Sequence, residues 1–151
     1  MFELYSEKAR RVIFFARREA SEMGDREIKP VHLLLGLLRE GKAMFFRLRV
    51  TPRKMKAIHR ACAKEASNQE QLPTSVDMPL HSLSGEILER ASGEMQTRKH
   101  VQLDLEHLLL ALLYVPSKAA EILQRQGITY AKAAATVETR GHEAPGMADY
   151  T

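Results

Sequence analysis

The chain is poor in cysteine and aromatic residues and has no tryptophan, and these shortages limit what it can be. A single cysteine, Cys62, cannot form an internal disulfide framework, so we expect a reducing, cytoplasmic setting. Aromatic residues make up only 6% of the 151 positions, so a core must be built mainly from Leu, Ile, Val, Met and Ala. Hydrophobic residues at 44% and charged residues at 28% are ordinary proportions for a globular domain.

Long hydrophobic runs are also missing. No apolar segment approaches the roughly 18 residues that a membrane-spanning helix needs. The first residues, MFELYSEKARR, lack the basic-then-apolar order of a secretory signal. We therefore expect no membrane association.

A complete nucleotide-binding motif is absent as well. The segment GLLREGKA, residues 36–43, fits G-x-x-x-x-G-K, but Ala43 has no hydroxyl group for Mg²⁺. The preceding HLLLGLL has no β-branched or aromatic residue that would favour the required strand. We interpret the segment as a buried helix that ends at Gly41, and we expect neither ATP binding nor an attached ATPase.

Constellations that could support catalysis or metal binding are incomplete. His59 and Cys62 lie three positions apart on one expected helix, but a structural zinc site needs four ligands, and Cys62 falls on the apolar face. A buried thiol without a neighbouring base is also a poor nucleophile. We therefore expect no enzymatic activity, no cofactor and no metal.

The charges are distributed unequally along the chain. Residues 1–67 hold 16 Lys/Arg and 8 Asp/Glu, a net charge of +8, whereas residues 68–151 hold 7 and 11, a net charge of −4. A basic first half can attract nucleic acid, anionic peptide or an acidic partner protein. The simpler interpretation is a set of solvated helix faces, because acidic residues alternate with the basic ones. A small basic nucleic-acid-binding protein remains the alternative function, although it lacks interleaved aromatic residues and a helix-turn-helix signature.

An internal repeat organises the chain. His32-LLLGLL and His107-LLLALL share six of seven residues at a separation of 75 positions. The same separation aligns Ile28 with Leu103. Further along, Val50-Thr51 matches Ile128-Thr129 at a separation of 78, which indicates a shorter connection in the first copy. A period of this length indicates a duplicated helical subdomain.

Each copy reads as a series of helices. Apolar residues recur at three-to-four spacing after Ser6, which can cap the first helix, and Gly24 is a plausible stop. Pro30 suits the first turn of the second helix, and Asp104 can cap the equivalent helix of the other copy. Two further helices are predicted to follow Thr51 and Thr129.

These signals predict an all-α protein with two pseudo-symmetric four-helix repeats in one bundle. The expected boundaries are residues 1–66 for the first repeat, 67–79 for a polar linker with two prolines, 80–139 for the second repeat and 140–151 for a loose tail.

The helix YSEKARRVIFFARREA followed by HLLLGLLREG, with its second copy, resembles the Clp N-terminal (Clp repeat) domain over about residues 2–138. That domain precedes the ATPase rings of the Clp/Hsp100 AAA+ unfoldases. The resemblance implies a pseudo-two-fold helical module that docks protein substrates or adaptor proteins onto a Clp-type unfoldase and performs no chemistry itself. It implies roles in chaperone function, substrate recognition and the regulation of proteolysis.

The resemblance also implies candidate binding residues. In some members a Thr-Glu-His triplet at the start of each second helix binds phosphoarginine, with the carboxylate on the guanidinium and the helix N-terminus on the phosphate. Here the triplets read Pro30-Val31-His32 and Leu105-Glu106-His107, so the second copy alone keeps the acid. Weak binding of phosphoarginine-like or Arg-rich peptides, at one site at most, is expected.

Four residues form the expected peptide- or adaptor-binding set: Ser6, Lys29, Asp104 and Glu106. Ser6 matches a family position that contributes, with an acid at the place of Glu106, to a surface for unfolded substrate. Lys29 adds a positive charge that favours phosphate but repels a guanidinium. Ser6 and Asp104 also have a structural interpretation as helix caps.

Overall fold

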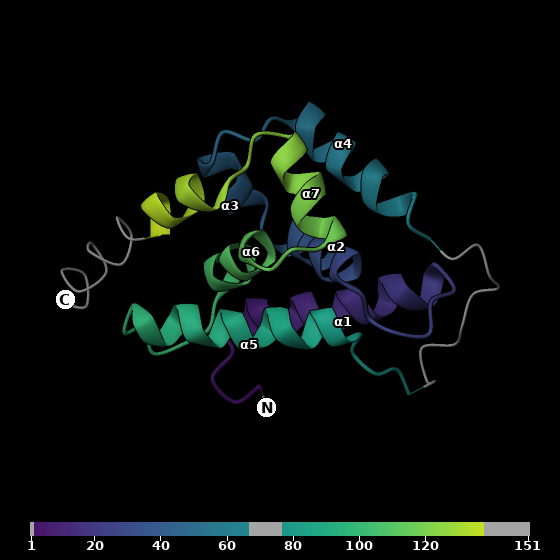
Figure 1. Cartoon of the computed structure of the whole chain (residues 1–151), viewed down its shortest axis with the longest axis horizontal. Coiled ribbons are helices and arrows are strands. Elements are labelled where there is room, and N and C mark those ends of the chain that lie inside the picture. The colour runs from purple at the N-terminus through teal and green to yellow at the C-terminus, as the bar shows by residue number, and fades with distance from the viewer. Residues whose placement is uncertain (1, 67–76, 138–151) are drawn as a thin grey trace.

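The computed structural model describes residues 2–66 and 77–137, and the regular elements in these ranges are all helices (Figure 1). They are α1 (Glu7–Glu22), α2 (Pro30–Glu40), α3 (Lys42–Arg47), α4 (Pro52–Ala63), α5 (Ser82–Thr97), α6 (Leu105–Tyr114), α7 (Lys118–Arg125) and a further helical stretch over residues 130–137. The prediction of an all-α protein with four helices in each repeat is confirmed. Most of the expected linker, residues 67–76, and the expected tail, residues 140–151, lie outside the described residues.

The two repeats differ in one connection, as the shift in sequence register predicts. A single residue, Gly41, separates α2 from α3, whereas residues 115–117 separate α6 from α7. Gly41 is the C-cap of α2, so the helix ends where the sequence predicts. Lys42 and Ala43 begin α3, a helix start that the sequence did not indicate.

Helices α2 and α6 form the centre of the molecule. Nine of the 11 residues of α2 and eight of the 10 residues of α6 are buried. Helix α2 packs against every other numbered helix, and Figure 1 shows α1 and α5 along one side of this centre and α3, α4 and α7 on the other. Leu34 and Leu109, which occupy matching places in the repeat, are almost completely buried. The inward orientation predicted for both Leu-rich segments is confirmed.

Backbone hydrogen bonds cross between the repeats just before the helices begin. The amide of Ser6 donates to the carbonyl of Leu103 at 2.8 Å, and the amide of Leu103 donates to the carbonyl of Leu4 at 2.8 Å. The same arrangement recurs 75 residues apart. The amide of His81 donates to the carbonyl of Ile28 at 3.0 Å, and the amide of Ile28 donates to the carbonyl of Pro79, also at 3.0 Å. These crossed pairs fix the start of α1 beside the start of α6, and the start of α2 beside the start of α5.

A buried histidine completes the start of each central helix. The Nδ1 atoms of His32 and His107 accept the amide hydrogens of Lys29 and Asp104, each at 2.8 Å. Because Nδ1 accepts, Nε2 carries the ring proton, and it donates to Asp25 in the first repeat and to His100 in the second. The repeated histidine is therefore a structural cap that satisfies backbone groups at a buried helix end.

The interface between α1 and α2 depends on a glycine. A Cβ atom at Gly36 would collide with the carbonyl oxygen of Val12 and would lie 3.2 Å from the amide nitrogen of Ala16. The matching residue of the second repeat is Ala111, which is fully buried. Helices α1 and α2 therefore approach more closely than an alanine at position 36 would permit.

We expect Gly36→Ala to destabilise the protein, although alanine is the better helix former by about 1 kcal/mol. A Cβ atom that collides with a backbone oxygen should cost about 2–3 kcal/mol, the upper part of the usual range for overpacking. After the gain in helix propensity, the free energy of unfolding should fall by about 1–2 kcal/mol in denaturant melts. Gly85 and Gly93 of α5 are matched controls, because a Cβ atom on either would meet nothing within 4 Å. Alanine at these two positions should leave stability unchanged or raise it. A Gly36→Ala variant as stable as these controls would contradict the close approach.

Stability should also depend on pH through the capping histidines. Burial lowers the pKa of His107 to about 4, with His100 acting in the same direction, and burial lowers the pKa of His32 as well. Below pH 6.5 the unfolded chain therefore takes up protons that the folded chain excludes. The contribution of the neutral histidines to the free energy of unfolding is fully present above about pH 6.5 and is lost as the pH falls towards 4. For His107 the loss amounts to about 2 kcal/mol by pH 5.

Urea unfolding between pH 7.5 and 4.5 measures this dependence. The variant His107→Gln keeps an acceptor for the cap and should show a shallower pH dependence, whereas His59→Gln, at an exposed position, should behave like the wild type. A free energy of unfolding that is level from pH 7 to pH 5 would show that the histidines titrate normally.

Candidate functional site

The structure brings two of the four expected site residues together. The hydroxyl group of Ser6 donates to Oδ1 of Asp104 at 2.9 Å and accepts the amide hydrogen of Ala9 at 3.1 Å. The same Oδ1 of Asp104 accepts the amide hydrogen of Leu105 at 2.8 Å. Ser6 is thus the N-cap of α1 and Asp104 the N-cap of α6, as the sequence predicts for both. Their polar atoms hold two helix starts together across the repeat boundary.

Glu106 lines a narrow crevice, and Lys29 belongs to the start of the other central helix. Glu106 is half-buried beside α3 and the stretch 130–137, at a crevice of only about 10 Å³. That volume holds about one water molecule, so this crevice is too small for a guanidinium group. Lys29 occupies the place in the first repeat that Asp104 occupies in the second, and its ammonium group contacts Asp25 at 3.0 Å.

Neither second-helix start combines the two halves of a phosphoarginine site. At α6 the carboxylate of Asp104 already caps the first amide and would repel a phosphate. At α2 the N-cap is Lys29, but Val31 is buried and apolar, and Pro30 removes one of the amide hydrogens that would bind an anion. Each start therefore lacks one of the two features that such a site combines: the α6 start has a capped first amide, and the α2 start has no carboxylate at position 31.

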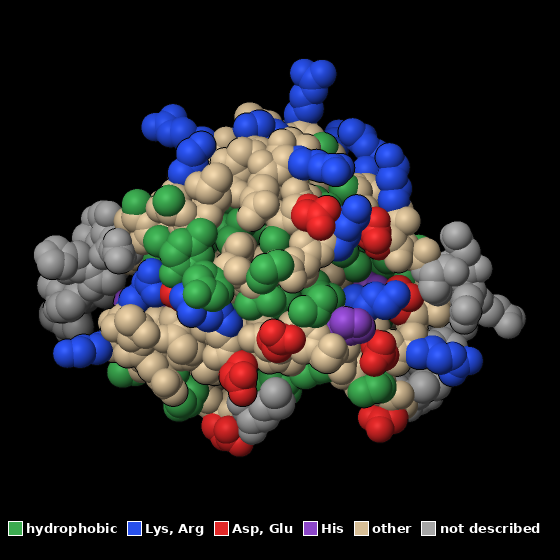
Figure 2. Space-filling view, viewed as in Figure 1, with side chains coloured by type: hydrophobic (Ala, Val, Ile, Leu, Met, Phe, Trp, Pro, Cys, Tyr) green, Lys and Arg blue, Asp and Glu red, His purple; other side chains and the backbone are tan. Residues whose placement is uncertain are grey.

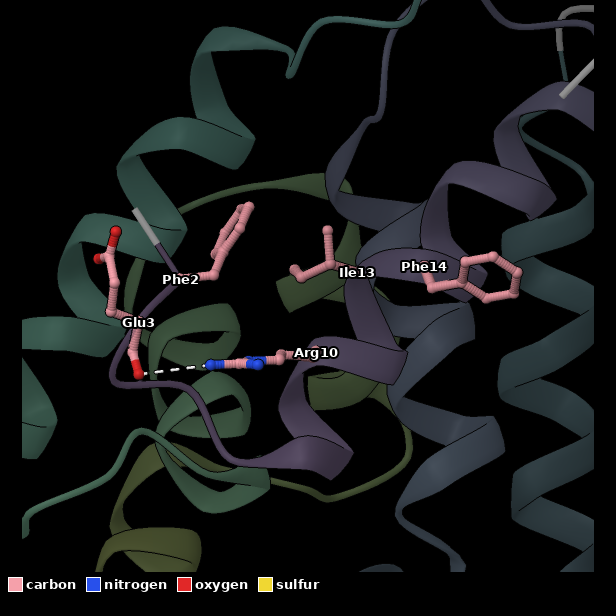
Figure 3. A pocket seen from close by; sticks show the side chains of 5 residues that line it. All are labelled: Phe2, Glu3, Arg10, Ile13 and Phe14. Atoms are coloured by element: carbon pink, nitrogen blue, oxygen red, sulfur yellow. Dashed lines mark hydrogen bonds between the residues drawn. The ribbon is translucent and has the colours of Figure 1, made fainter. Parts of the chain in front are cut away.

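An open, mostly apolar pocket lies at the start of α1 (Figure 3). Its volume is about 450 Å³, and its lining consists of Phe2, Glu3, Arg10, Ile13 and Phe14. Figure 3 shows Phe2 and Ile13 facing the same open space, while the Arg10 guanidinium reaches the backbone carbonyl of Glu3 at 3.4 Å. Phe14 is 60% exposed, so its ring is accessible to a ligand in the pocket.

This pocket was not predicted from the sequence. The apolar stripe of the first helix identifies the residues that face the core, and Phe14 lies outside that stripe. A phenylalanine on the polar face of an amphipathic helix is the signal that could have found it. The contribution of Phe2 depends on how the N-terminal segment folds back beside α1, which no local pattern indicates.

Other polar clusters serve the fold. Glu94 of α5 is buried and is fully paired with Arg90, with Arg98 and with the hydroxyl group of Tyr130 at 2.9 Å. Cys62 is buried in the core, and burial raises the pKa of its thiol to about 12, which disfavours the reactive thiolate form. Among the described residues, no group of three or more His, Cys, Asp or Glu side chains could hold a metal ion. Within the same ranges, no helix has the length and apolar character needed to cross a membrane.

The chain is 28% identical over 145 residues to the chloroplastic chaperone protein ClpD2 of Oryza sativa subsp. japonica, and the match covers 93% of this chain. It covers 15% of the relative, so the chain spans a small part of the length of the curated protein that it matches.

Solved structures share the fold. The N-terminal domain of Hsp104 from Candida albicans superimposes with a TM-score of 0.74 at 20% identity, covering 95% of this chain and 93% of that one. A structure from a malarial protein secretion system gives a TM-score of 0.86 at 19% identity, covering 93% and 97%. At these identities the likeness concerns the fold alone.

The family comparison agrees with the internal repeat. The family model of the Clp repeat (R) N-terminal domain matches residues 4–126 and, a second time, residues 80–148. The first match covers most of the chain, and the second begins where the second repeat is expected to begin. Together with the crossed helix starts and the paired central helices, these matches show that the chain belongs to the Clp repeat N-terminal domain family.

Proposed function

We propose that this chain is a non-enzymatic recognition module that docks extended protein segments for a Clp-type unfoldase, with the α1 pocket as the docking surface. The observation that carries this proposal is the open pocket lined by Phe2, Ile13 and Phe14 on a domain of the Clp repeat family. The occupant is an unfolded segment that places an apolar side chain against these residues.

The chemistry of the pocket suits such a segment. Apolar lining residues gain free energy by covering the side chain of an incoming residue, at about 25 cal/mol per Å² of apolar surface removed from water. Arg10 is exposed and makes only a long hydrogen bond to a carbonyl, so its guanidinium group can donate to a backbone carbonyl or a carboxylate of the bound segment. Binding by apolar burial beside one hydrogen-bond donor does not require a particular peptide sequence. Such low sequence specificity is what a module for unfolded segments needs.

A second part of the proposal concerns the pair formed by Ser6 and Asp104. Both residues lie at the start of α1 or α6, and their shared hydrogen bond occupies the hydroxyl group and one carboxylate oxygen. We propose that they act in recognition chiefly by holding α1, and hence the pocket, in place. Direct contact between these caps and a bound adaptor would require the shared hydrogen bond to open.

Replacing Phe14 tests the docking surface. Phe14 is 60% exposed, so Phe14→Ala should change stability little but should weaken binding of an unfolded polypeptide about tenfold, as expected for an aromatic anchor. The measurement is fluorescence anisotropy with a labelled unfolded polypeptide whose cysteines are capped by a neutral group. Phe46→Ala is the matched control, because Phe46 is 79% exposed on α3 and does not line the pocket. Equal losses in the two variants would mean that binding is non-specific apolar contact.

Replacing Glu106 tests the weaker, family-derived site. We expect free phosphoarginine or an Arg-rich peptide to bind weakly, at one site at most, because neither helix start offers both a carboxylate and an uncapped anion site. Glu106→Ala should abolish that binding in isothermal titration, whereas Glu86→Ala, an exposed acid on α5, should leave it unchanged. Two equivalent sites, or wild-type affinity in the Glu106 variant, would contradict the assignment of the carboxylate.

A further inference from the structure

A second pocket lies where the two repeats meet, away from the α1 pocket. Its volume is about 280 Å³, and it lies between the turn joining α3 to α4 and the turn joining α7 to the stretch 130–137. Val50 and Ile128 provide apolar lining, one from each turn. Figure 2 shows lysine and arginine side chains along the upper rim of the molecule, over α3, α4 and α7, on the side opposite to the start of α1.

The charged residues that line this pocket are all basic. They are Arg49, Lys54 and Lys132, and no acidic side chain is among the lining residues. The ammonium groups of Lys54 and Lys132 approach the same residue, Gly127. Nζ of Lys132 lies 3.3 Å from its carbonyl oxygen, and Nζ of Lys54 lies 4.0 Å from the place that a Cβ atom would occupy if the residue had one. Like charges gathered without an acid repel one another, and a bound anion would relieve that repulsion.

Both repeats contribute to the pocket in equivalent ways. Lys54 and Lys132 are separated by 78 positions, the same separation that aligns Val50 with Ile128. Each lysine lies in the first turn of a helix, and its backbone amide donates to the hydroxyl oxygen of the threonine that caps that helix. A single anion can therefore contact one lysine from each repeat.

The backbone of Arg49 adds an independent observation. Arg49 has a φ of 62°, in the left-handed region, and its counterpart in the second repeat is Gly127, with a φ of 81°. Glycine adopts this conformation without strain, whereas an arginine pays a conformational cost. Lys99 shows that a positive φ alone does not mark a site, because it has a similar conformation outside this pocket. Arg49 differs from Lys99 because its side chain lines the same pocket as Lys54 and Lys132 and adds a third positive charge there.

We propose that this pocket binds a doubly charged oxyanion of the phosphate class, held between Lys54 of one repeat and Lys132 of the other, with Arg49 beside them. Such an anion links the last helix of each repeat and stabilises the contact between the two halves. This site goes beyond the proposed docking function, since it involves other residues and another type of ligand.

Thermal unfolding in phosphate tests the pocket. Inorganic phosphate should raise the melting temperature of the wild type in a saturable manner, compared with sodium chloride at the same ionic strength. Amide signals of Gly127 and Ile128 should shift in NMR spectra over the same concentration range. Equal effects of phosphate and chloride, with no saturable shift at these amides, would overturn the proposal.

Variants separate a pocket from general electrostatic attraction. Lys54→Gln and Lys132→Gln should each weaken phosphate binding about three- to fivefold, as for the loss of one exposed charge pair. Lys56→Gln is the matched control, because Lys56 is an exposed lysine on α4 outside the lining residues. Similar losses in all three variants would show non-specific binding and would overturn the assignment.

Arg49→Gly separates binding from folding. Glycine removes the guanidinium group and relaxes the left-handed backbone, so the melting temperature without phosphate should stay level or rise while phosphate binding weakens. A stable Arg49→Gly variant with wild-type affinity would contradict the role of Arg49 and the argument from backbone strain.

The source of the phosphate group can be identified with the same titration. Phosphoserine and inorganic phosphate are compared as probes. Similar affinities support a free ion as the ligand, and affinity for phosphoserine at least fivefold higher supports a phosphate group carried on a larger molecule. Saturable binding of neither probe would overturn the proposal.

Discussion

The crossed backbone hydrogen bonds before the helices are the constraint on which the rest of the structure depends. Each pair joins the segment before an outer helix of one repeat to the segment before the central helix of the other. They act together with the shared core, in which α2 of the first repeat packs against α5, α6 and α7 of the second. With them, α1 begins beside α6, and Ser6 can share a hydrogen bond with Asp104. The relative position of the two halves is thus fixed in part by backbone groups, whose hydrogen bonds do not depend on the identity of the side chains.

The burial of α2 and α6 explains why candidate recognition surfaces lie at the periphery. Nearly all residues of these helices contact other helices, and His32 and His107 are committed to capping their starts. The exposed charged side chains belong mainly to the outer helices and the turns. A domain built in this way can change its binding surface without altering its core, since the residues that fold it and the residues that bind are largely distinct.

The two proposed sites use different physical interactions and lie on opposite sides of the central helices. The α1 pocket offers apolar surface with a single arginine donor, which suits an extended polypeptide. The pocket between the repeats offers three cations in a small volume, which suits a compact anion. The second site also gives a structural meaning to the basic charge of the first 67 residues: Arg49 and Lys54 come from that half, but Lys132 comes from the acidic half and is brought to them by the fold.

Equivalent places in the repeats sometimes hold equivalent interactions with the partners exchanged. Arg39 of α2 lies 4.0 Å over the ring of Phe15 of α1, whereas Arg90 of α5 lies 3.4 Å over the ring of Tyr114 of α6. Each cation–π pair joins the outer and central helix of its repeat, but the arginine and the aromatic residue have changed places. Comparing residue types position by position does not detect this correspondence, because the conserved quantity is the contact and not the residue.

The sequence by itself determined the helices, their caps and the duplication. Caps such as Ser6, Thr51 and Asp104 act on amides within a few residues, and the apolar stripes follow the helical period, so these features are local and readable. Only the tertiary structure decided which distant residues meet. It placed Ser6 against Asp104, 98 positions away, gave Gly36 its close contact with α1, placed Phe2 beside Ile13, and gathered Lys54 and Lys132 around Gly127. These contacts depend on how the helices pack across the two repeats, and no periodicity or spacing within a single helix encodes that arrangement.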